Sequence, residues 1–563
     1  MFSSLTRKGN GVLGSRFGAP MKVAMCVLVA TVFAACTRVG TTSGTSAAGN
    51  PWTHHGVLRM ANISEPDSLD PVVGNFQIDS DLAMLWAGFF FNWSDRSEFV
   101  PELATVVPTA ANGGISKDGK TIVYHLRRGV LWQDGKPFSA DDVIFTYHAI
   151  MNKNNNVPST VGYDLITAID KLDPYTIRVH LKAPYAPFVS SFFALSGTPY
   201  PVLPAHLLAK YPNINRVDFN QQPIGTGPFI VQHWQRGSKI VLVANPHYWR
   251  GPPKLRRIEY NPVPNENTIA TLLQSHDVDL EYNAASANYD VLKNIPGTVV
   301  RLTPFTQYSQ LGLNLRTPAL ADVRVRRALW YALDIPKLIH DVTHDVNVPG
   351  YSDQPDFLWA YNPNVAHYPY NPAKARDLLE SAGWKLGSDG IRMRNGQRLT
   401  LIMAIPTGAA TSNAVAVLAQ RAWHDVGVDA QVKSYTTSLY FATYGAGGIT
   451  QTGKFDVAFF SWVNGTDPDD STLWMSDQWP PNGQNVYHFH NAELDAAERI
   501  ALTNADRAVR KKAYDRIQAV LADQVPMIVS WYSRRISVEN TDLKNYRPAH
   551  AVTSFWNSWE WSI

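Results

Sequence analysis

The chain has 563 residues and a formal net charge of +3. This length predicts more than one domain, and the small charge gives no electrostatic argument for binding nucleic acid. The only cysteines, Cys26 and Cys36, lie near the N-terminus, so we expect neither an internal disulfide nor a thiol nucleophile in the rest of the chain.

The first 36 residues have the pattern of a secretory signal. The cations before the apolar run are Arg7, Lys8, Arg16 and Lys22. The run itself, 23–35, is free of acidic residues and is short for a transmembrane helix, which needs about 20 apolar residues. It ends in Phe33-Ala34-Ala35-Cys36, which is similar to a lipobox. The segment therefore predicts cleavage before Cys36, lipidation of Cys36, and a mature chain with a net charge of about −1.

Two alternatives to this interpretation stay open. The segment could be a plain signal peptide with an incidental cysteine, and the true start could be Met21 rather than Met1. Residues 37–51 are rich in glycine, serine, threonine and alanine, which predicts a flexible tether between the signal and the body of the chain.

Residues 121–143 predict a strand, a turn and the start of a helix. The segment 121–126 is rich in isoleucine, valine and tyrosine, which favours a strand. Asp134-Gly135 is a turn dipeptide. Ser139, with Asp142 three residues later, has the pattern of a capping box before an apolar helical face.

The order of residues from Tyr124 to Val143 is more diagnostic of a protein family than these predicted elements are. It resembles the signature segment of the family 5 extracellular solute-binding proteins, which are the oligopeptide-, dipeptide- and nickel-binding receptors of ABC importers. Ser68-Leu69-Asp70-Pro71 and the segment 224–258 are similar to further parts of that family. Gly225-Thr226-Gly227 lacks the Lys-Ser/Thr of a phosphate-binding loop, so we do not interpret it as one.

The resemblance continues through three predicted helices. Asp322 is expected to cap the first, and Asn371 the second, with Pro372 at its first position. Asp506 is expected to cap the third, which Pro526 ends before a strand at 527–532. The resemblance thus covers almost all of the chain after the tether.

The resemblance implies an α/β fold, a two-lobed periplasmic-binding-protein clamshell with an additional domain in lobe I. Carried over by motif position, the expected parts are lobe I at 52–95, 224–309 and 535–563, the additional domain at 96–223, and lobe II at 310–534. The chain is expected to cross between the lobes near 308–314 and 531–535. Two crossings make a hinge that can absorb closure around a ligand.

The binding residues also follow from the resemblance. In peptide-binding relatives the loop after the Leu-Asp-Pro element touches the ligand, and here that loop is Asn75-Phe76-Gln77. Relatives carry Trp-x-x-Asp after a buried strand, and that Asp pairs with the ligand's α-amino group. Trp462 matches, but Gly465 stands where the Asp is expected. Asn464 lies between them, and Asp467 is the nearest carboxylate in sequence. This departure weakens the case for free peptides.

No motif of a catalytic site is present, and we expect neither enzyme activity nor a cofactor. The chain has no Gly-x-Ser-x-Gly and no His-Glu-x-x-His segment. His488 and His490 would lie on one side of a strand and could bind a metal, although surface or paired histidines are the preferred interpretation. Asp469-Asp470 could be a glycosidase pair, although a polar turn is preferred.

Three functions remain for comparison. The preferred one is a monomeric, lipid-anchored receptor in the periplasm or at the cell surface. It would bind a peptide or peptide-sized polar solute and serve a membrane permease and its ATPase. The second is a receptor of the same fold for a metal chelate, a sugar or another small solute. The third is a secreted hydrolase acting on polysaccharide.

Overall fold

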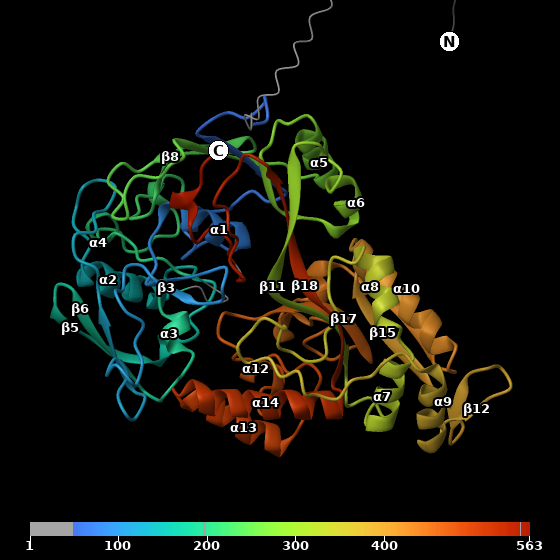
Figure 1. Cartoon of the computed structure of the whole chain (residues 1–563). Coiled ribbons are helices and arrows are strands. Elements are labelled where there is room, and N and C mark those ends of the chain that lie inside the picture. Colours follow the sequence, from blue (N-terminus) through green and yellow to red (C-terminus); the bar gives the residue numbers. More distant parts are fainter. Residues whose placement is uncertain (1–48, 195–198, 552) are drawn as a thin grey trace, which may run out of the picture. The chain divides into compact units, whose positions relative to one another are not determined.

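The computed structural model describes residues 49–194, 199–551 and 553–563 (Figure 1). Residues 49–563 group into one unit. Cys36 and the predicted signal segment lie outside the described residues, so the lipidation of Cys36 stays a prediction.

A ten-stranded mixed sheet runs through the described part of the chain. Its strands, in spatial order, are β16 (Asp429–Tyr435), β15 (Thr400–Pro406), β17 (Val457–Val463), β11 (Thr298–Leu313), β18 (Met527–Asn540), β10 (Leu280–Ala284), β1 (Val57–Asn62), β9 (Arg257–Pro262), β8 (Lys239–Ala244) and β7 (Phe229–Gln235). The first four residues of β17 are all buried, as expected for an apolar run in the interior of a sheet that is covered on both faces.

Two long strands lie in the middle of this sheet and connect its two halves. β11 and β18 are antiparallel and lie side by side, β11 in green and β18 in red in Figure 1. Their pairing extends from Thr298–Asn540 to Gly312–Met527, with register shifts between Pro304 and Tyr308 and between Ser309 and Gln310. β11 also pairs with β17, and β18 with β10. These two strands therefore belong to both halves of the sheet.

Within the described residues, the remaining strands form three smaller sheets. They are β4 (Thr121–His125), β6 (Thr176–Leu181) and β5 (Ile166–Asp173); β2 (Phe91–Trp93) and β3 (Phe99–Pro101); and β12 (Lys385–Leu386), β13 (Arg392–Arg394) and β14 (Gln397–Arg398). Burial alternates along β6, as expected for a strand with one face toward a core.

The α-helices are α1 (Gln77–Trp86), α2 (Ala140–Met151), α3 (Phe188–Ser191), α4 (Ala205–Leu208), α5 (Glu266–Gln274), α6 (Tyr289–Leu292), α7 (Val323–Tyr331), α8 (Ile335–Thr343), α9 (Pro372–Ser381), α10 (Ala410–His424), α11 (Thr437–Tyr440), α12 (Ser471–Trp474), α13 (Ala492–Thr503) and α14 (Arg507–Gln524).

The helix starts expected from the sequence are confirmed. At α2, Ser139 and Asp142 form the capping box, and the Asp142 carboxylate accepts the Ser139 N–H at 2.9 Å. At α9, Asn371 accepts the Lys374 N–H at 3.0 Å. Each such bond satisfies one of the amide groups that the first turn of a helix leaves without a partner. Asp322 and Asp506 cap α7 and α14 in the same way.

Two large apolar cores occupy different stretches of the chain. The first draws its buried residues from 58–282 and 543–561 and includes Trp86, Tyr124 and Trp561. The second draws its buried residues from 308–532 and includes Trp423 and Trp474. The lobe and domain limits given above stay predictions.

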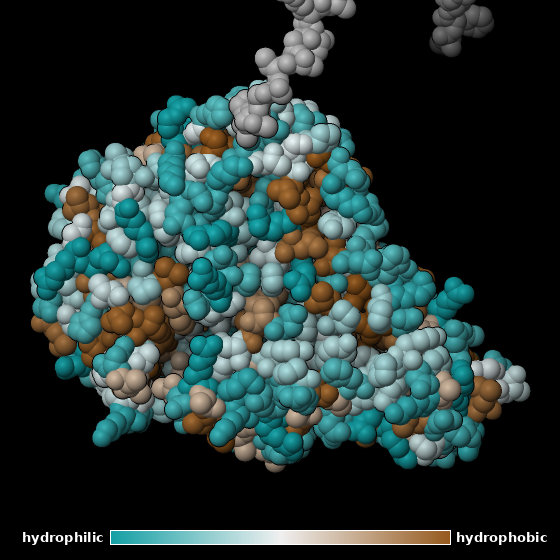
Figure 2. Space-filling view, in the orientation of Figure 1, coloured by the Kyte–Doolittle hydropathy of each residue, from teal (hydrophilic) through white to brown (hydrophobic). Residues whose placement is uncertain are grey.

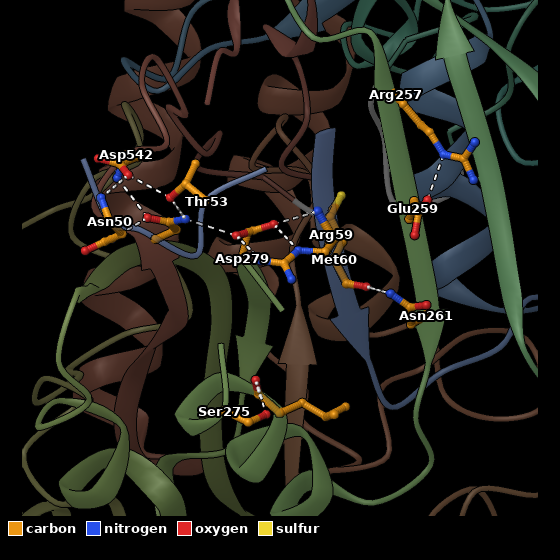
Figure 3. A network of polar contacts seen from close by, with 12 residues as sticks. Asn50, Thr53, Arg59, Met60, Arg257, Glu259, Asn261, Ser275, Asp279 and Asp542 are labelled. Atoms are coloured by element: carbon orange, nitrogen blue, oxygen red, sulfur yellow. Dashed lines mark hydrogen bonds and ion pairs between the residues drawn. The ribbon is translucent and has the colours of Figure 1, made fainter. Parts of the chain in front are cut away.

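A network of polar contacts fixes the start of the described chain (Figure 3). The guanidinium of Arg59 donates two hydrogen bonds to Asp279, at 2.8 and 2.9 Å. Asp279 also accepts from the Asn540 amide at the end of β18, at 3.0 Å. The Asn50 N–H donates to Asp542 at 2.6 Å. The bond between Asn50 and Asp542 joins positions 492 residues apart in sequence.

Two expectations from the sequence are corrected here. The strand expected at 527–532 extends to Asn540, because its charged second half finds partners, among them Glu539 with Arg301 at 2.8 Å. The prediction that His488 and His490 lie on one side of a strand is wrong. His488 is buried in a turn with a φ of 54°, whereas His490 is exposed. Burial first, and Arg316 second, lower the pKa of His488 to about 4.

Candidate functional site

A cavity of about 550 Å³ lies between the two cores. We call it the inter-core cavity. Residues of 93–115 and 186–190 form one wall, and residues of 357–359, 466–467 and 505–510 form the other. Trp93 and Phe99 lie on the first wall, and Phe357 and Trp359 on the second. The cavity thus combines aromatic surface from parts of the chain that are far apart in sequence.

Two contacts bridge the walls beside this cavity. The Tyr185 hydroxyl donates to Asp469 at 3.0 Å, and the Ala186 N–H donates to the Leu502 carbonyl at 2.7 Å. Burial raises the pKa of Asp469, and the neighbouring Asp467 raises it further. The same burial keeps the pKa of Tyr185 above its ordinary value, so the phenol is the proton donor in this pair.

Asp467 is held by a buried ion pair. The guanidinium of Arg510, whose side chain is 8% exposed, donates to both carboxylate oxygens at 2.8 and 2.5 Å. Arg510 also donates to the Ala501 carbonyl and the Tyr514 hydroxyl. Burial alone would lower the pKa of Arg510, but Asp467 raises it above its ordinary value. Both oxygens of Asp467 are therefore already engaged by a cation of the protein.

Trp359 gives the second wall a flat aromatic surface beside these charges. The guanidinium carbons of Arg507 and Arg510 lie 4.9 and 5.4 Å from the centre of the indole ring. Such cation–π contacts fix the orientation of the ring. The indole is therefore held in place by α14.

Buried carboxyl groups support the loop that carries Asp467. Asp353, Asp470 and Glu498 are each at most 3% exposed. Burial is the largest cause that raises the pKa values of Asp470 and Glu498 well above the ordinary range. The next cause is repulsion by a neighbouring carboxylate, Asp353 for Asp470 and Asp469 for Glu498. The Gln354 amide donates to Asp470 at 3.2 Å and to the Pro468 carbonyl at 3.1 Å. Within the described residues, no group of three acidic, histidine or cysteine side chains is arranged to hold a metal ion.

A second cavity, of about 620 Å³, lies beside Trp462, and we call it the Trp462 cavity. Its walls come from 441–445, 450–451, 460–462 and 473–486. Trp462 and Phe460 alternate with Ser461 along β17, so both point to the same face of the sheet. Trp462 pairs in register with Tyr308 of β11. The cavity thus adjoins the strands that connect the two cores.

The end of β17 and the loop after it contribute residues to both cavities. Phe460 and Trp462 line the Trp462 cavity, and Thr466 and Asp467 line the inter-core cavity. Between them the Asn464 N–H donates to the Thr306 carbonyl at 2.6 Å, and its side-chain amide donates to the Asp353 carbonyl at 2.8 Å. The Asn464 amide nitrogen is therefore directed into the protein rather than into either cavity.

The loop Asn75-Phe76-Gln77 lies at the start of α1, with all three residues exposed. Asp67 holds the Asn75 side chain at 2.8 Å, and Phe76 is 56% exposed. None of the three lines either cavity described above. The structure therefore places Trp462 at the end of β17 and Asp467 in the loop after it, each lining its own cavity, and leaves the α1 loop apart from both cavities.

Several residues in or beside these walls were not found from the sequence. They are Tyr185, Trp359, Phe441, Tyr444 and Arg510. Arg510 lies four residues before Tyr514 on α14, a spacing that places the two side chains on one face. The spacing indicates the pair but says nothing about Asp467, which is 43 residues away in sequence.

One face of the protein has a mixed hydropathy. On the face seen in Figure 2, hydrophobic side chains form separate patches in a mostly hydrophilic surface. Within the described residues, no helix is both long and apolar enough to cross a membrane.

Residues 98–484 match the family described as bacterial extracellular solute-binding proteins, family 5 Middle. The chain belongs to this family. Family 5 proteins bind solutes and are not enzymes, so the hydrolase alternative is set aside. The chain is an extracellular solute-binding protein of the kind that serves ABC importers.

Individual relatives of this family 5 protein support the assignment over nearly its whole length. The oligopeptide-binding protein AppA of Bacillus subtilis (strain 168) is 25% identical over 551 residues, covering 96% of this chain and 98% of the relative. A solved structure of AppA from Bacillus subtilis in complex with a nonapeptide has a TM-score of 0.71, with 24% identity over 90% of this chain and 98% of that one.

A second solved structure contains a different ligand. NikZ from Campylobacter jejuni in complex with Ni(L-His) has a TM-score of 0.73 and 26% identity, covering 91% of this chain and 100% of that one. The expected fold, the two-lobed α/β fold of periplasmic binding proteins, is therefore confirmed. Relatives with this fold bind both peptides and metal complexes.

Proposed function

We propose that this chain is the lipid-anchored substrate-binding protein of an ABC importer. It captures a peptide or peptide-sized polar solute between its two lobes and delivers it to a membrane permease with its ATPase. It acts as a monomer on the outer side of the membrane, held by a lipid on Cys36. The proposed contact residues are Asn75, Phe76, Gln77, Trp462, Asn464, Gly465 and Asp467, of which Trp462 and Asp467 line the cavities described above.

The inter-core cavity is the observation that carries this proposal. Its walls come from both cores, so a molecule inside it contacts both at once. Its volume of about 550 Å³ falls within the range of roughly 300–1,000 Å³ that is usual for small-molecule sites. The register shifts in β11 near Tyr308 supply a place where two strands can bend as the lobes close. A ligand in this position stabilises the closed state by its contacts with both walls.

The second candidate is a ligand without a free α-amine, either a modified peptide or a non-peptide solute, and the charges around the loop favour it. A free peptide brings an ammonium group, which needs an anionic partner when it is removed from water. Gly465 offers no side chain, and both oxygens of Asp467 are engaged by Arg510. A ligand without a free α-amine at this position, such as a modified peptide or a metal chelate, avoids this requirement.

Calorimetry with matched peptides separates the two candidates. The purified mature protein is titrated with a set of free peptides and with the same peptides N-acetylated. Tighter binding of the free forms supports a peptide receptor in which another anion meets the ammonium. Equal or tighter binding of the acetylated forms supports a ligand without a free amine. Mass spectrometry of the small molecules that co-purify with the protein identifies further candidates for the same titration.

Scattering tests the proposed closure directly. Small-angle X-ray scattering is recorded without ligand and with a saturating amount of any compound that binds in the titration. We expect a smaller radius of gyration in the bound state. An unchanged radius of gyration at saturation would contradict closure of the lobes around the ligand.

A further inference from the structure

The Trp462 cavity has no charged lining. None of the described residues on its walls is an aspartate, glutamate, lysine, arginine or histidine. A cation or anion inside it would lose water without gaining a partner of opposite charge, which is unfavourable. The cavity therefore discriminates against charged groups of either sign.

Aromatic rings provide much of its surface. Phe441 and Tyr444 are 52% and 47% exposed, which is unusual for large apolar side chains. Phe460 and Trp462 add two further rings from β17. A flat apolar group placed between such rings covers their exposed faces and gains the offset or edge-to-face contacts that aromatic pairs prefer.

Several of the polar side chains on the walls are bonded within the protein. The Gln451 amide donates to Gln484 at 2.7 Å. The Thr450 hydroxyl donates to the Tyr440 carbonyl at 2.9 Å, and the Ser461 and Ser309 hydroxyls lie 2.7 Å apart. A sugar ring needs several free donors and acceptors for its hydroxyl groups, and the bonded side chains do not supply them. The exposed rings favour an aromatic group, and the experiment below includes a carbohydrate as the competing ligand.

One short segment contributes to both cavities, with Phe460 and Trp462 in this one and Thr466 and Asp467 in the inter-core cavity. We propose that the Trp462 cavity is the specificity pocket of the receptor and that it selects an uncharged aromatic side chain of a peptide ligand. This inference rests on the proposed peptide-receptor function and adds the class of side chain that the site accepts.

The test uses three N-acetylated tripeptides, Ala-Phe-Ala, Ala-Lys-Ala and Ala-Glu-Ala, with cellobiose as a carbohydrate probe. Titration calorimetry with the full mature protein is expected to give a dissociation constant at least about 10-fold lower for the Phe peptide than for either charged peptide. The substitution Tyr444→Glu, on an exposed ring, is expected to weaken the Phe peptide and to strengthen the Lys peptide relative to it. The matched control is Tyr370→Glu, because Tyr370 is 53% exposed and lines neither cavity.

The outcomes separate this inference from the proposed function. Equal affinities for all three peptides, unchanged by Tyr444→Glu, overturn the inference and leave the peptide receptor intact. If none of the three acetylated peptides binds while free peptides bind in the earlier titration, the inference is overturned and the peptide receptor stands. If neither acetylated nor free peptides bind, both are overturned. Binding of cellobiose in place of the peptides overturns the choice of an aromatic side chain. Equal effects of Tyr444→Glu and Tyr370→Glu also overturn it, because the effect would then not come from the cavity.

Discussion

The hydroxyl of Tyr185 donates a hydrogen bond of 3.0 Å to the carboxylate of Asp469, although the two residues are 284 positions apart. Tyr185 packs against the first core, and Asp469 follows the loop of the second core that carries Asp467. The bond therefore joins the two walls of the inter-core cavity and stabilises the arrangement in which they meet.

Substitution of this tyrosine is expected to weaken ligand binding. Tyr185→Phe keeps the ring and removes the donor, so the closed arrangement loses a hydrogen bond to a carboxyl group. Such bonds contribute about 1.5 kcal/mol or somewhat more, so we expect affinity to fall about 10-fold. Calorimetry with an established ligand measures this. The control is Tyr147→Phe, whose hydroxyl bonds to the Ile166 carbonyl within one side of the cavity. An equal loss in both variants would contradict a bridging role.

Loss of the Asp467 carboxylate is expected to destabilise the fold. Asp467→Asn leaves the buried guanidinium of Arg510 without its anionic partner. Breaking a buried pair in this way costs about 3–5 kcal/mol in the free energy of unfolding. Urea denaturation measures it. The control is Asp341→Asn, in an exposed pair with Lys337, where about 0.3–0.5 kcal/mol is expected. A cost at Asp467 no larger than the control would show that the pair is not buried in solution.

Stability is expected to decrease as the pH rises, in part because of Asp70. Burial raises the pKa of this fully buried carboxyl from 3.8 to about 7. Between these values the unfolded chain releases a proton that the folded chain retains, so a rise in pH favours unfolding. One such group changes the free energy of unfolding by at most about 1.4 kcal/mol per pH unit. Urea denaturation from about pH 4 to about pH 7 measures the slope, which Asp70→Asn should reduce. An unchanged slope would mean that Asp70 does not retain its proton.

The lipid anchor is tested by a cysteine substitution. Cys36→Ser removes the thiol that the lipobox pattern assigns to acylation, and the mature protein should then leave the membrane fraction. Several acyl chains give stable anchoring, whereas a single chain gives only marginal binding. Cell fractionation followed by immunoblotting measures the distribution. Cys26→Ser is the matched control within the same segment, and we expect it to remain membrane-bound. Retention of both variants in the membrane would contradict lipidation at Cys36.

Local features of the fold were predictable from the sequence. The caps at Ser139, Asn371 and Asp506 depend on side chains that bond to amides within three residues. Such contacts are encoded next to each other in the chain, so a short pattern is enough to find them. The length of β18 was not predictable in the same way, because its second half depends on partners such as Arg301.

The candidate site was predictable only in part. Trp462 was found because the motif around it is continuous in sequence. The role of Asp467 as the partner of Arg510, and the bond between Tyr185 and Asp469, depend on how distant segments pack. His488 was misplaced because the sequence around it alternates like a strand, whereas its backbone adopts a left-handed turn.

The pairing of β11 with β18 has a consequence for how the protein melts. Because these strands contribute pairs to both halves of the sheet, disruption of either core removes hydrogen-bonded partners from the other. The halves are therefore thermodynamically coupled through their backbone as well as through any bound solute. In differential scanning calorimetry such coupling favours a single cooperative transition, in which both cores lose their heat of unfolding together.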